Sequence, residues 1–227
     1  MIVTEIWRYP IKTMAGEMLQ RAQVGPLGID GDRIVHVESV QNKVITSRSH
    51  PRFLGHKGTL SADGEPLVDG LLWNSPEIAA EVVEIAGSGA KLVRYHGAER
   101  FDVLPLLVAT DGAIAAFGHD RRRLRPNIVI GGVEGMTERG WPGGCLRIGK
   151  VLIGVQDLRL RCIMTSYDPD TLAQEKEITR GIYQRFEGKL ALNCFVIEGG
   201  EIAVGDEVQQ VHGRACAESA AAAVFAE

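Results

Sequence analysis

RCIMTSYDPDT, residues 161–171, places a cysteine at the end of an apolar strand and directly before a turn. Apolar residues recur at every second position from 158 to 164, which predicts a strand with Cys162 on its apolar face. The run Asp168-Pro169-Asp170-Thr171 is rich in side chains that cap backbone groups, so it predicts a turn just beyond the strand. Because loops at strand ends commonly carry functional sites, this stretch is the first candidate for one.

Cys162 has two interpretations from its residue type and position. Free cysteine is among the most often buried residues, so a cysteine on the apolar face of a strand is most simply part of the core. Arg159 and Arg161 would, however, stabilise a thiolate if the strand ended or twisted there, and the thiolate is the form that attacks a substrate or binds a metal. The residues alone leave both interpretations open.

The rest of the chain predicts a mainly β protein with about a dozen short strands and two or three short helices. One helix is expected over 76–86, where Ser75 and Pro76 give a starting signal, and another over 112–117, where Thr110 can act as N-cap. No repeated β-α-β alternation appears, which argues against a doubly wound sheet. A mainly β, barrel-like architecture fits this pattern best.

Composition limits the possible partners and compartments. The chain has 227 residues, of which 45% are hydrophobic and 24% charged. A net charge of −4 argues against a general nucleic-acid binder, which needs a basic surface to displace counterions. No apolar run approaches the length of a membrane span, and Glu5 and Arg8 interrupt what would have to be the core of a signal peptide. We therefore predict a cytoplasmic protein that binds neither nucleic acid nor a membrane.

The cysteines give no recognisable cluster. They stand singly, without a C-x-x-C pair, at Cys145, Cys162, Cys194 and Cys216. This spacing indicates neither a zinc site nor a local iron–sulfur pattern, and a disulfide framework is not expected. Cys194 lies within a predicted strand over 190–198 and is expected in the core. If the protein performs redox chemistry, it contains no visible electron relay of its own.

The stretch 161–171 resembles the cysteine segment of the MOSC family, the molybdenum cofactor sulfurase C-terminal domain family, which includes the mitochondrial amidoxime-reducing component. Five further segments resemble the family in the same order: Tyr9-Pro10-Ile11-Lys12-Thr13, Gly31-Asp32-Arg33, Arg125-Pro126-Asn127-Ile128-Val129, Leu146-Arg147-Ile148-Gly149 and Val204-Gly205-Asp206-Glu207-Val208. The resemblance implies a MOSC-type β-barrel with a smaller N-terminal β subdomain and a few short helices. We expect the N-terminal subdomain over residues 1–95, the MOSC domain over 96–212 and a tail over 213–227.

The resemblance also implies a molybdenum cofactor, a molybdopterin that carries the metal. The cofactor-binding residues that it implies are Lys12, Thr13, Arg33, Thr110, Arg125, Asn127 and Cys162. The Cys162 thiolate would be the protein ligand of molybdenum, a role suited to a soft sulfur donor. Lys12, Thr13 and Arg33 offer an ammonium, a hydroxyl and a guanidinium, all of which are suitable donors to a phosphate. Ordinary alternatives remain for each residue, such as a solvated loop for Lys12 and Thr13, or simple helix capping for Thr110.

The activity implied by the resemblance is reduction of small N-hydroxylated or N-oxygenated compounds, with the oxygen released as water. Asp168 is the nearest acid that could relay a proton, although an aspartate in such a turn is more often a cap. A separate flavin or iron–sulfur protein would supply the electrons. One alternative is sulfur transfer through a Cys162 persulfide, weakened because the pyridoxal-phosphate sulfurase portion of fused relatives is absent. The other is a module that binds the molybdenum cofactor without catalysis.

The sequence departs from the commonest family form at Leu172, where relatives have a glycine after Asp-Pro-Asp-Thr. The loop over the site, residues 172–189, is therefore expected to differ in shape. Its first part, 172–180, fits either a short helix or an irregular loop.

Overall fold

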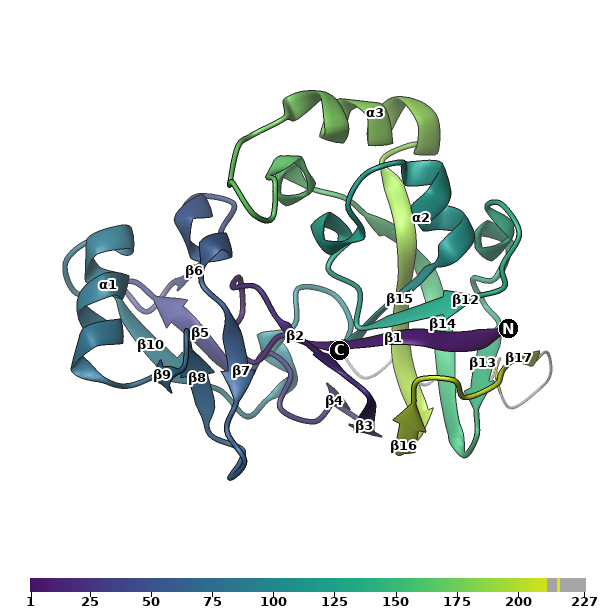
Figure 1. Ribbon diagram of the computed structural model, residues 1–227, viewed down its shortest axis with the longest axis horizontal. Helices are drawn as coiled ribbons and strands as arrows, with labels where there is room; N and C mark the ends of the chain where they lie inside the picture. The colour runs from purple at the N-terminus through teal and green to yellow at the C-terminus, as the bar shows by residue number, and fades with distance from the viewer. Residues whose placement is uncertain (212–215, 217–227) are drawn as a thin grey trace.

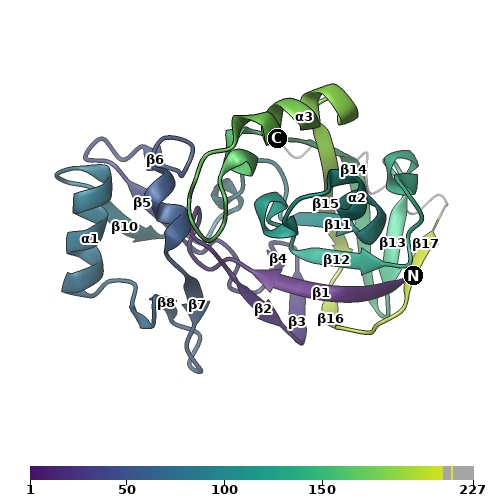
Figure 2. The ribbon, with the colours of Figure 1, turned by 45° about the horizontal axis from the view of Figure 1, so that its top comes forward.

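The computed structural model describes residues 1–211 and residue 216, and these form two lobes (Figure 1). The smaller lobe carries α1 and strands β5 to β10, and the larger lobe carries the main sheet with α2 and α3 above it (Figures 1 and 2). The prediction of a mainly β protein with few helices is confirmed. Among the described residues, no helix combines the length and apolar character needed to cross a membrane.

The described strands are β1 (Ile2–Arg8), β2 (Glu17–Leu19), β3 (Arg21–Gly25), β4 (Gly28–Ile29), β5 (Val35–Glu38), β6 (Val44–Ile45), β7 (Gly58–Leu60), β8 (Pro66–Val68), β9 (Leu71–Leu72), β10 (Lys91–Arg94), β11 (Leu106–Thr110), β12 (Ile128–Gly131), β13 (Cys145–Ile148), β14 (Val151–Leu160), β15 (Lys189–Glu198), β16 (Gly200–Ala203) and β17 (Val208–Val211). The helices are α1 (Pro76–Ala86), α2 (Asp111–Phe117) and α3 (Lys176–Phe186), with 3₁₀ turns η1 (Pro51–Gly55), η2 (Ala98–Arg100), η3 (Arg121–Leu124), η4 (Thr137–Gly140) and η5 (Ile163–Ser166).

The large sheet has eight strands in the order β17-β13-β14-β15-β11-β12-β1-β2. Neighbouring strands are antiparallel except β11 and β12, which are parallel. β17, at one end of this order, approaches β1, next to the other end, because Val208 donates a backbone hydrogen bond to the Met1 carbonyl (2.9 Å) and Ile2 bridges to Glu207. The sheet therefore curls around its own apolar face instead of extending flat.

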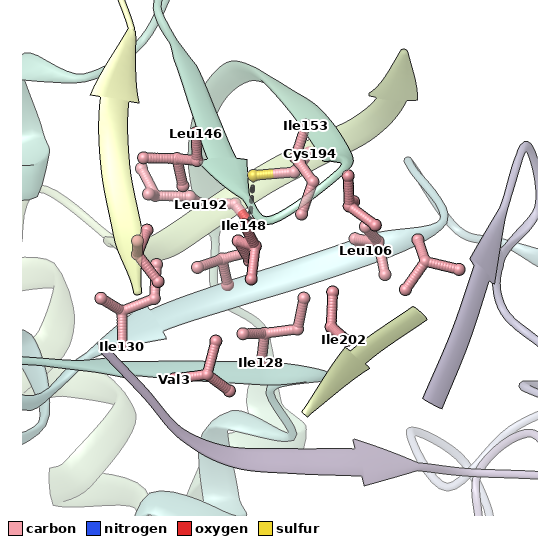
Figure 3. Close-up of a cluster of buried hydrophobic side chains, with 14 of the residues drawn as sticks. Val3, Leu106, Ile128, Ile130, Leu146, Ile148, Ile153, Leu192, Cys194 and Ile202 are labelled. Atoms are coloured by element: carbon pink, nitrogen blue, oxygen red, sulfur yellow. Dashed lines mark hydrogen bonds between the residues drawn. The ribbon is translucent and has the colours of Figure 1, made fainter. Parts of the chain in front are cut away.

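Inward-facing side chains fill the interior of this curled sheet. Figure 3 shows Val3, Leu106, Ile128, Ile153 and Leu192 meeting there from five different strands. The alternation of inward apolar residues along each strand produces this arrangement, because successive side chains point to opposite faces. The smaller lobe has a core of its own, built from β5, η1 and the buried face of α1. Each lobe thus has its own apolar core.

The capping signals place two helices as predicted. The Ser75 hydroxyl accepts a hydrogen bond from the Ile78 N–H (3.4 Å) at the start of α1. The Thr110 hydroxyl accepts one from the Ala113 N–H (3.1 Å) at the start of α2. The third helix, α3, begins later than the open prediction for 172–180 and continues to Phe186.

The central stretch differs from the predicted strand. β14 ends at Leu160, and Cys162 directly precedes the 3₁₀ turn η5, so Met164 lies in that turn and not in a strand. β14 has register irregularities between Val155 and Asp157 and again between Leu158 and Leu160. An irregularity of this kind changes which face of the sheet a residue occupies. The prediction that apolar residues alternate along one strand up to position 164 was therefore wrong.

One pair of cysteines also differs from the prediction, because Cys145 and Cys216 form a disulfide with 5.8 Å between their Cα atoms. The two residues are 71 positions apart, so their spacing carries no signal for pairing. Cys145 starts β13 and pairs across the sheet with Val211 at the end of β17, five residues before Cys216. Apart from Cys216, the predicted tail over 213–227 lies outside the described residues. Cys194 is fully buried, as expected.

Candidate functional site

A cavity with Cys162 in its wall is lined by residues of both lobes. Lys12, Thr13, Arg33 and Arg48 come from the N-terminal part of the chain. The larger lobe contributes Leu106 and Leu107 of β11, Arg125 after η3, and Arg159, Arg161 and Cys162 at the end of β14. The segment between the lobes adds Phe101, Asp102 and Val103. Five of the residues implied by the family resemblance therefore lie around one cavity: Lys12, Thr13, Arg33, Arg125 and Cys162.

Three of these five have a backbone conformation that is uncommon for their type. Thr13, Arg33 and Arg125 have φ angles of 83°, 53° and 54°. Positive φ occurs in only a few per cent of non-glycine residues, and it is a genuine outlier for a β-branched residue such as threonine. Such strain persists only where surrounding contacts impose it, and it clusters at functional sites.

Thr13 is held by a hydrogen-bonded contact with Ser47. The two hydroxyls share a hydrogen bond, and the Ser47 hydroxyl donates to the Thr13 carbonyl (3.0 Å). The Ser47 N–H also donates to the Thr13 hydroxyl. Both residues are buried, so their polar atoms are satisfied by each other. This contact fixes the turn that follows Lys12.

Arg33 is oriented by the fully buried carboxylate of Asp32. That carboxylate accepts hydrogen bonds from Arg33, from the Tyr9 N–H (2.7 Å) and from the Asn127 amide (3.2 Å). The Asn127 side chain also donates to the Trp7 carbonyl (3.2 Å) and accepts from the Leu107 N–H (3.1 Å). Asn127 is fully buried and does not line the cavity, so it positions Asp32 and Arg33 instead of contacting a ligand there.

Arg125 packs over the ring of Tyr9, with 4.3 Å from the guanidinium carbon to the ring centroid. Its Nη2 donates to the Met14 carbonyl (2.7 Å), and burial lowers the pKa of the guanidinium. Arg33 lies over the same ring at 5.5 Å. The Tyr9 hydroxyl donates to the Pro126 carbonyl (3.1 Å), and burial raises the pKa of this phenol. Two cations thus lie within cation–π distance of one aromatic ring, which is a favourable arrangement.

Cys162 is a free, half-buried thiol surrounded by arginines. Arg161 is buried, and burial lowers the pKa of its guanidinium to about 10. Its Nη2 donates to the Leu124 carbonyl (2.7 Å), while its buried Nε has no partner in the described part of the chain. Although burial opposes it, contact with Cys162 and the charge of Asp102 raise the pKa of Arg48. Arg48 and Arg161 therefore place two guanidinium groups beside the Cys162 sulfur.

Two predicted site residues lie away from this cavity. Thr110 ends β11, and its hydroxyl caps α2 and donates to Glu138 (3.2 Å). Leu106, at the other end of β11, lines the cavity, so the strand places Thr110 roughly 13 Å further along at about 3.3 Å per residue. The Asp168 carboxylate caps the N–H groups of Asp170 and Thr171, and it pairs with Arg123 (2.8 Å). Neither side chain lines the cavity, and both match their ordinary alternative as caps.

Sequence reasoning missed Asp102. Among the described residues it is the only acidic one that lines the cavity, and Lys12, Arg48 and Arg159 surround it. Asp102 belongs to an irregular segment between the lobes and to no motif. Only the positive charge of the residues that meet around it could have signalled it, and these residues are far apart in the sequence.

The fold and the cavity define a class of two-part β proteins in which a basic cavity with a cysteine in its wall collects residues from both parts. The family model described as the MOSC domain matches residues 111–209, and the model described as the MOSC N-terminal beta barrel domain matches residues 1–91. The chain belongs to the MOSC family.

One solved structure shows the same fold at low sequence identity, and a second is similar over part of the chain. The YUAD protein from Bacillus subtilis is 12% identical with a TM-score of 0.52, over 93% of this chain and 96% of that one. YiiM from Escherichia coli is 19% identical with a TM-score of 0.37, over 52% of this chain and 61% of that one. No curated protein matches the sequence. The first likeness supports the fold alone, and the predicted boundary after residue 95 stays a prediction.

Proposed function

We propose that the protein binds the molybdenum cofactor in this cavity and with it reduces small N-hydroxylated or N-oxygenated compounds. The charge of the cavity carries the proposal. Although the whole chain has a net charge of −4, one carboxylate and seven cations line the cavity in the described part of the chain. The cations are Lys12, Arg33, Arg48, Arg123, Arg125, Arg159 and Arg161. A cavity of this charge selects an anionic ligand, such as a pterin with a phosphate.

The donor set fits such a cofactor. Lys12 and Arg33 would donate to its phosphate, and the Thr13 hydroxyl adjoins them. Arg125, fixed over Tyr9, would present a flat cation toward the pterin, and the sulfur of Cys162 would be the metal ligand. The unpartnered Nε of Arg161 leaves one further donor beside Cys162. The bound cofactor would supply the two-electron chemistry.

The overall reaction converts an N–O bond into N–H and water, which consumes two electrons and two protons. A separate flavin or iron–sulfur protein would deliver the electrons. Asp168 is a poor proton donor, because hydrogen bonds from the Thr171 and Asp170 N–H groups lower its pKa. We therefore drop Asp168 from the mechanism. The two protons would come from solvent water.

The first experiment is elemental analysis for molybdenum on protein made in a host that synthesises the cofactor. The wild type is expected to hold about one metal per chain and to reduce a hydroxylamine with a chemical electron donor. Cys162→Ala should lose the metal and the activity, whereas Cys194→Ala, a control in the core, should keep both. Metal-free wild-type protein with sulfane sulfur on Cys162 would favour sulfur transfer instead. Tight cofactor binding without turnover would favour a binding module.

A further inference from the structure

Three cations from distant parts of the chain converge on the carboxylate of Asp102. The Lys12 Nζ lies 2.7 Å from Oδ1, and the Arg48 Nη2 lies 2.5 Å from Oδ2. The Arg159 Nη2 lies 3.9 Å from Oδ2. Although partial burial opposes it, the charges of Lys12, Arg48 and Arg159 lower the pKa of Asp102, so the carboxylate is ionised at neutral pH. This geometry is that of a bound oxyanion.

Lys12 is tied to the same segment by a second contact. Its ammonium group has three N–H donors, of which Asp102 takes one and the Arg100 carbonyl another (2.9 Å). Only one donor is left for any ligand. Arg100 in turn donates to the Leu27 carbonyl (3.1 Å). Lys12 thus holds the segment 98–103 at the cavity through its contacts with Arg100 and Asp102.

Two anions cannot share these cations without cost. A phosphate beside an ionised Asp102 would meet its negative charge at close range, and like charges at such distances repel strongly in partly buried surroundings. Asp102 belongs to an irregular segment at the rim, with 32% of its side chain exposed, so its carboxylate can swing outward without unfolding a strand.

We propose that Asp102 fills an oxyanion position between Lys12, Arg48 and Arg159, and that an external oxyanion binds there by displacing it and releasing the segment 98–103. The oxyanion has two possible sources, the phosphate of the cofactor or an anionic group of the small-molecule substrate. In naming these sources the inference rests on the proposed function. The displacement itself does not depend on it.

Calorimetric titration of the metal-free full-length protein with inorganic phosphate tests the position. Asp102→Asn should bind phosphate about tenfold more tightly than the wild type, because the competing charge is gone. Asp63→Asn, which changes an exposed turn aspartate, should match the wild type. Arg48→Gln should weaken phosphate binding about tenfold, whereas Arg52→Gln, which changes an exposed arginine paired with Glu84, should not. Equal affinity of Asp102→Asn and wild type, or no phosphate binding by any variant, would overturn the proposal.

Limited trypsin digestion tests the movement of the segment. Phosphate should speed cleavage after Arg100 in the wild type, and Asp102→Asn should be cleaved quickly with or without phosphate. If phosphate bound without changing cleavage of the wild type, the anion would sit beside Asp102 and the displacement model would be wrong.

Comparison of metal-free and cofactor-loaded protein identifies the source of the oxyanion. Loaded protein that no longer binds inorganic phosphate assigns the position to the cofactor phosphate. Loaded protein that still binds it, with competition against the substrate, assigns it to the substrate. Both results support the oxyanion position. If the protein never accepts the cofactor, the proposed function fails while the phosphate titration of the metal-free protein still decides the inference.

Discussion

The Asn127 side chain connects β1 and β11 with the turn that holds Asp32. Its amide donates to Asp32 of the N-terminal part and to Trp7 of β1, and its oxygen accepts from Leu107 of β11. Asp32 is fully buried, so its oxygens depend on these donors and on Arg33 for hydrogen bonds. Loss of the amide would leave a charged group partly unsatisfied inside the protein, which is far more costly than loss of a hydrogen bond at the surface.

Asn127→Ala is therefore expected to lower the free energy of unfolding by about 3 kcal/mol. It should also weaken anion binding, because Arg33 loses its fixed orientation. Chemical denaturation measures the first effect and phosphate titration the second. Asn74→Ala, which changes an exposed asparagine before α1, serves as control and should change neither. A loss of less than about 1 kcal/mol for Asn127→Ala would mean that Asp32 needs no support from it.

Asp102 gives stability a defined pH dependence. An aspartate in an unfolded chain has a pKa of about 3.9, and in the folded protein the cations around Asp102 lower its pKa below that value. A lowered carboxyl pKa contributes stability that is present above about pH 4 and lost as the pH falls through the folded-state value. The difference in unfolding free energy between wild type and Asp102→Asn should therefore be constant near neutral pH and shrink below about pH 4. Denaturation curves across this range check it, and a difference that grew in acid would contradict the ionised carboxylate.

The sequence identified some residues of the site but not the contacts that surround them. Cys162 and Arg33 could be found because each sits in a motif. Their environment could not be found, because the partners of Asn127 lie 95 and 120 positions away and those of Asp102 belong to three separate segments. The sequence could not decide whether Cys162 is buried or exposed, because that too depends on residues far away in the chain.

At the scale of elements, local signals predicted local structure. α1 occupies the predicted 76–86, and α2 begins after its predicted cap, because both are fixed by a side chain that bonds the first turn. α3 lacks this signal, since the residue before it, Glu175, makes no side-chain cap. Its position follows instead from packing, because Ile178, Ile182 and Phe186 are spaced by four residues and face the larger lobe.

Two glycines in open space separate backbone effects from packing effects. Gly118 ends α2 with φ 73°, and Gly181 lies inside α3 with ordinary helical geometry, and an added Cβ would touch nothing within 4 Å at either. Gly118→Ala should lower the unfolding free energy by about 1 kcal/mol because an L-residue is strained there. Gly181→Ala should raise it by about 0.5–1 kcal/mol because glycine weakens a helix interior. Thermal or denaturant unfolding checks both, and equal signs would show that factors other than backbone conformation dominate.

At the scale of the whole molecule, period-two patterns and turn signals were sufficient for a mainly β protein, and the ordered motifs were sufficient for the family. The sequence could not predict how the two lobes meet. The cavity between them forms from contacts between segments that are far apart in the chain and that carry no motif for such contacts. The disulfide is a second long-range contact of this kind. The cytoplasmic prediction rested partly on singly scattered cysteines, and the Cys145–Cys216 bond removes that support, since disulfides persist mainly in oxidising surroundings.

The disulfide should contribute measurable stability to the larger lobe. It closes a loop of 71 residues, for which the chain-entropy model gives about 4 kcal/mol. Both of its residues are buried in one apolar cluster with Leu152 of β14, so the bond holds Cys216 against β13 and β14. Cys145→Ser and Cys216→Ser should each lower the unfolding free energy by up to about 4 kcal/mol, and the double variant should lose little more than either alone. Reduction of the wild type should lower its unfolding free energy by a similar amount. Cys162→Ser should lose as much stability on reduction as the wild type does, because Cys162 is not part of the disulfide. Losses that added in the double variant would mean that the two residues contribute separately, as buried thiols and not as a bond.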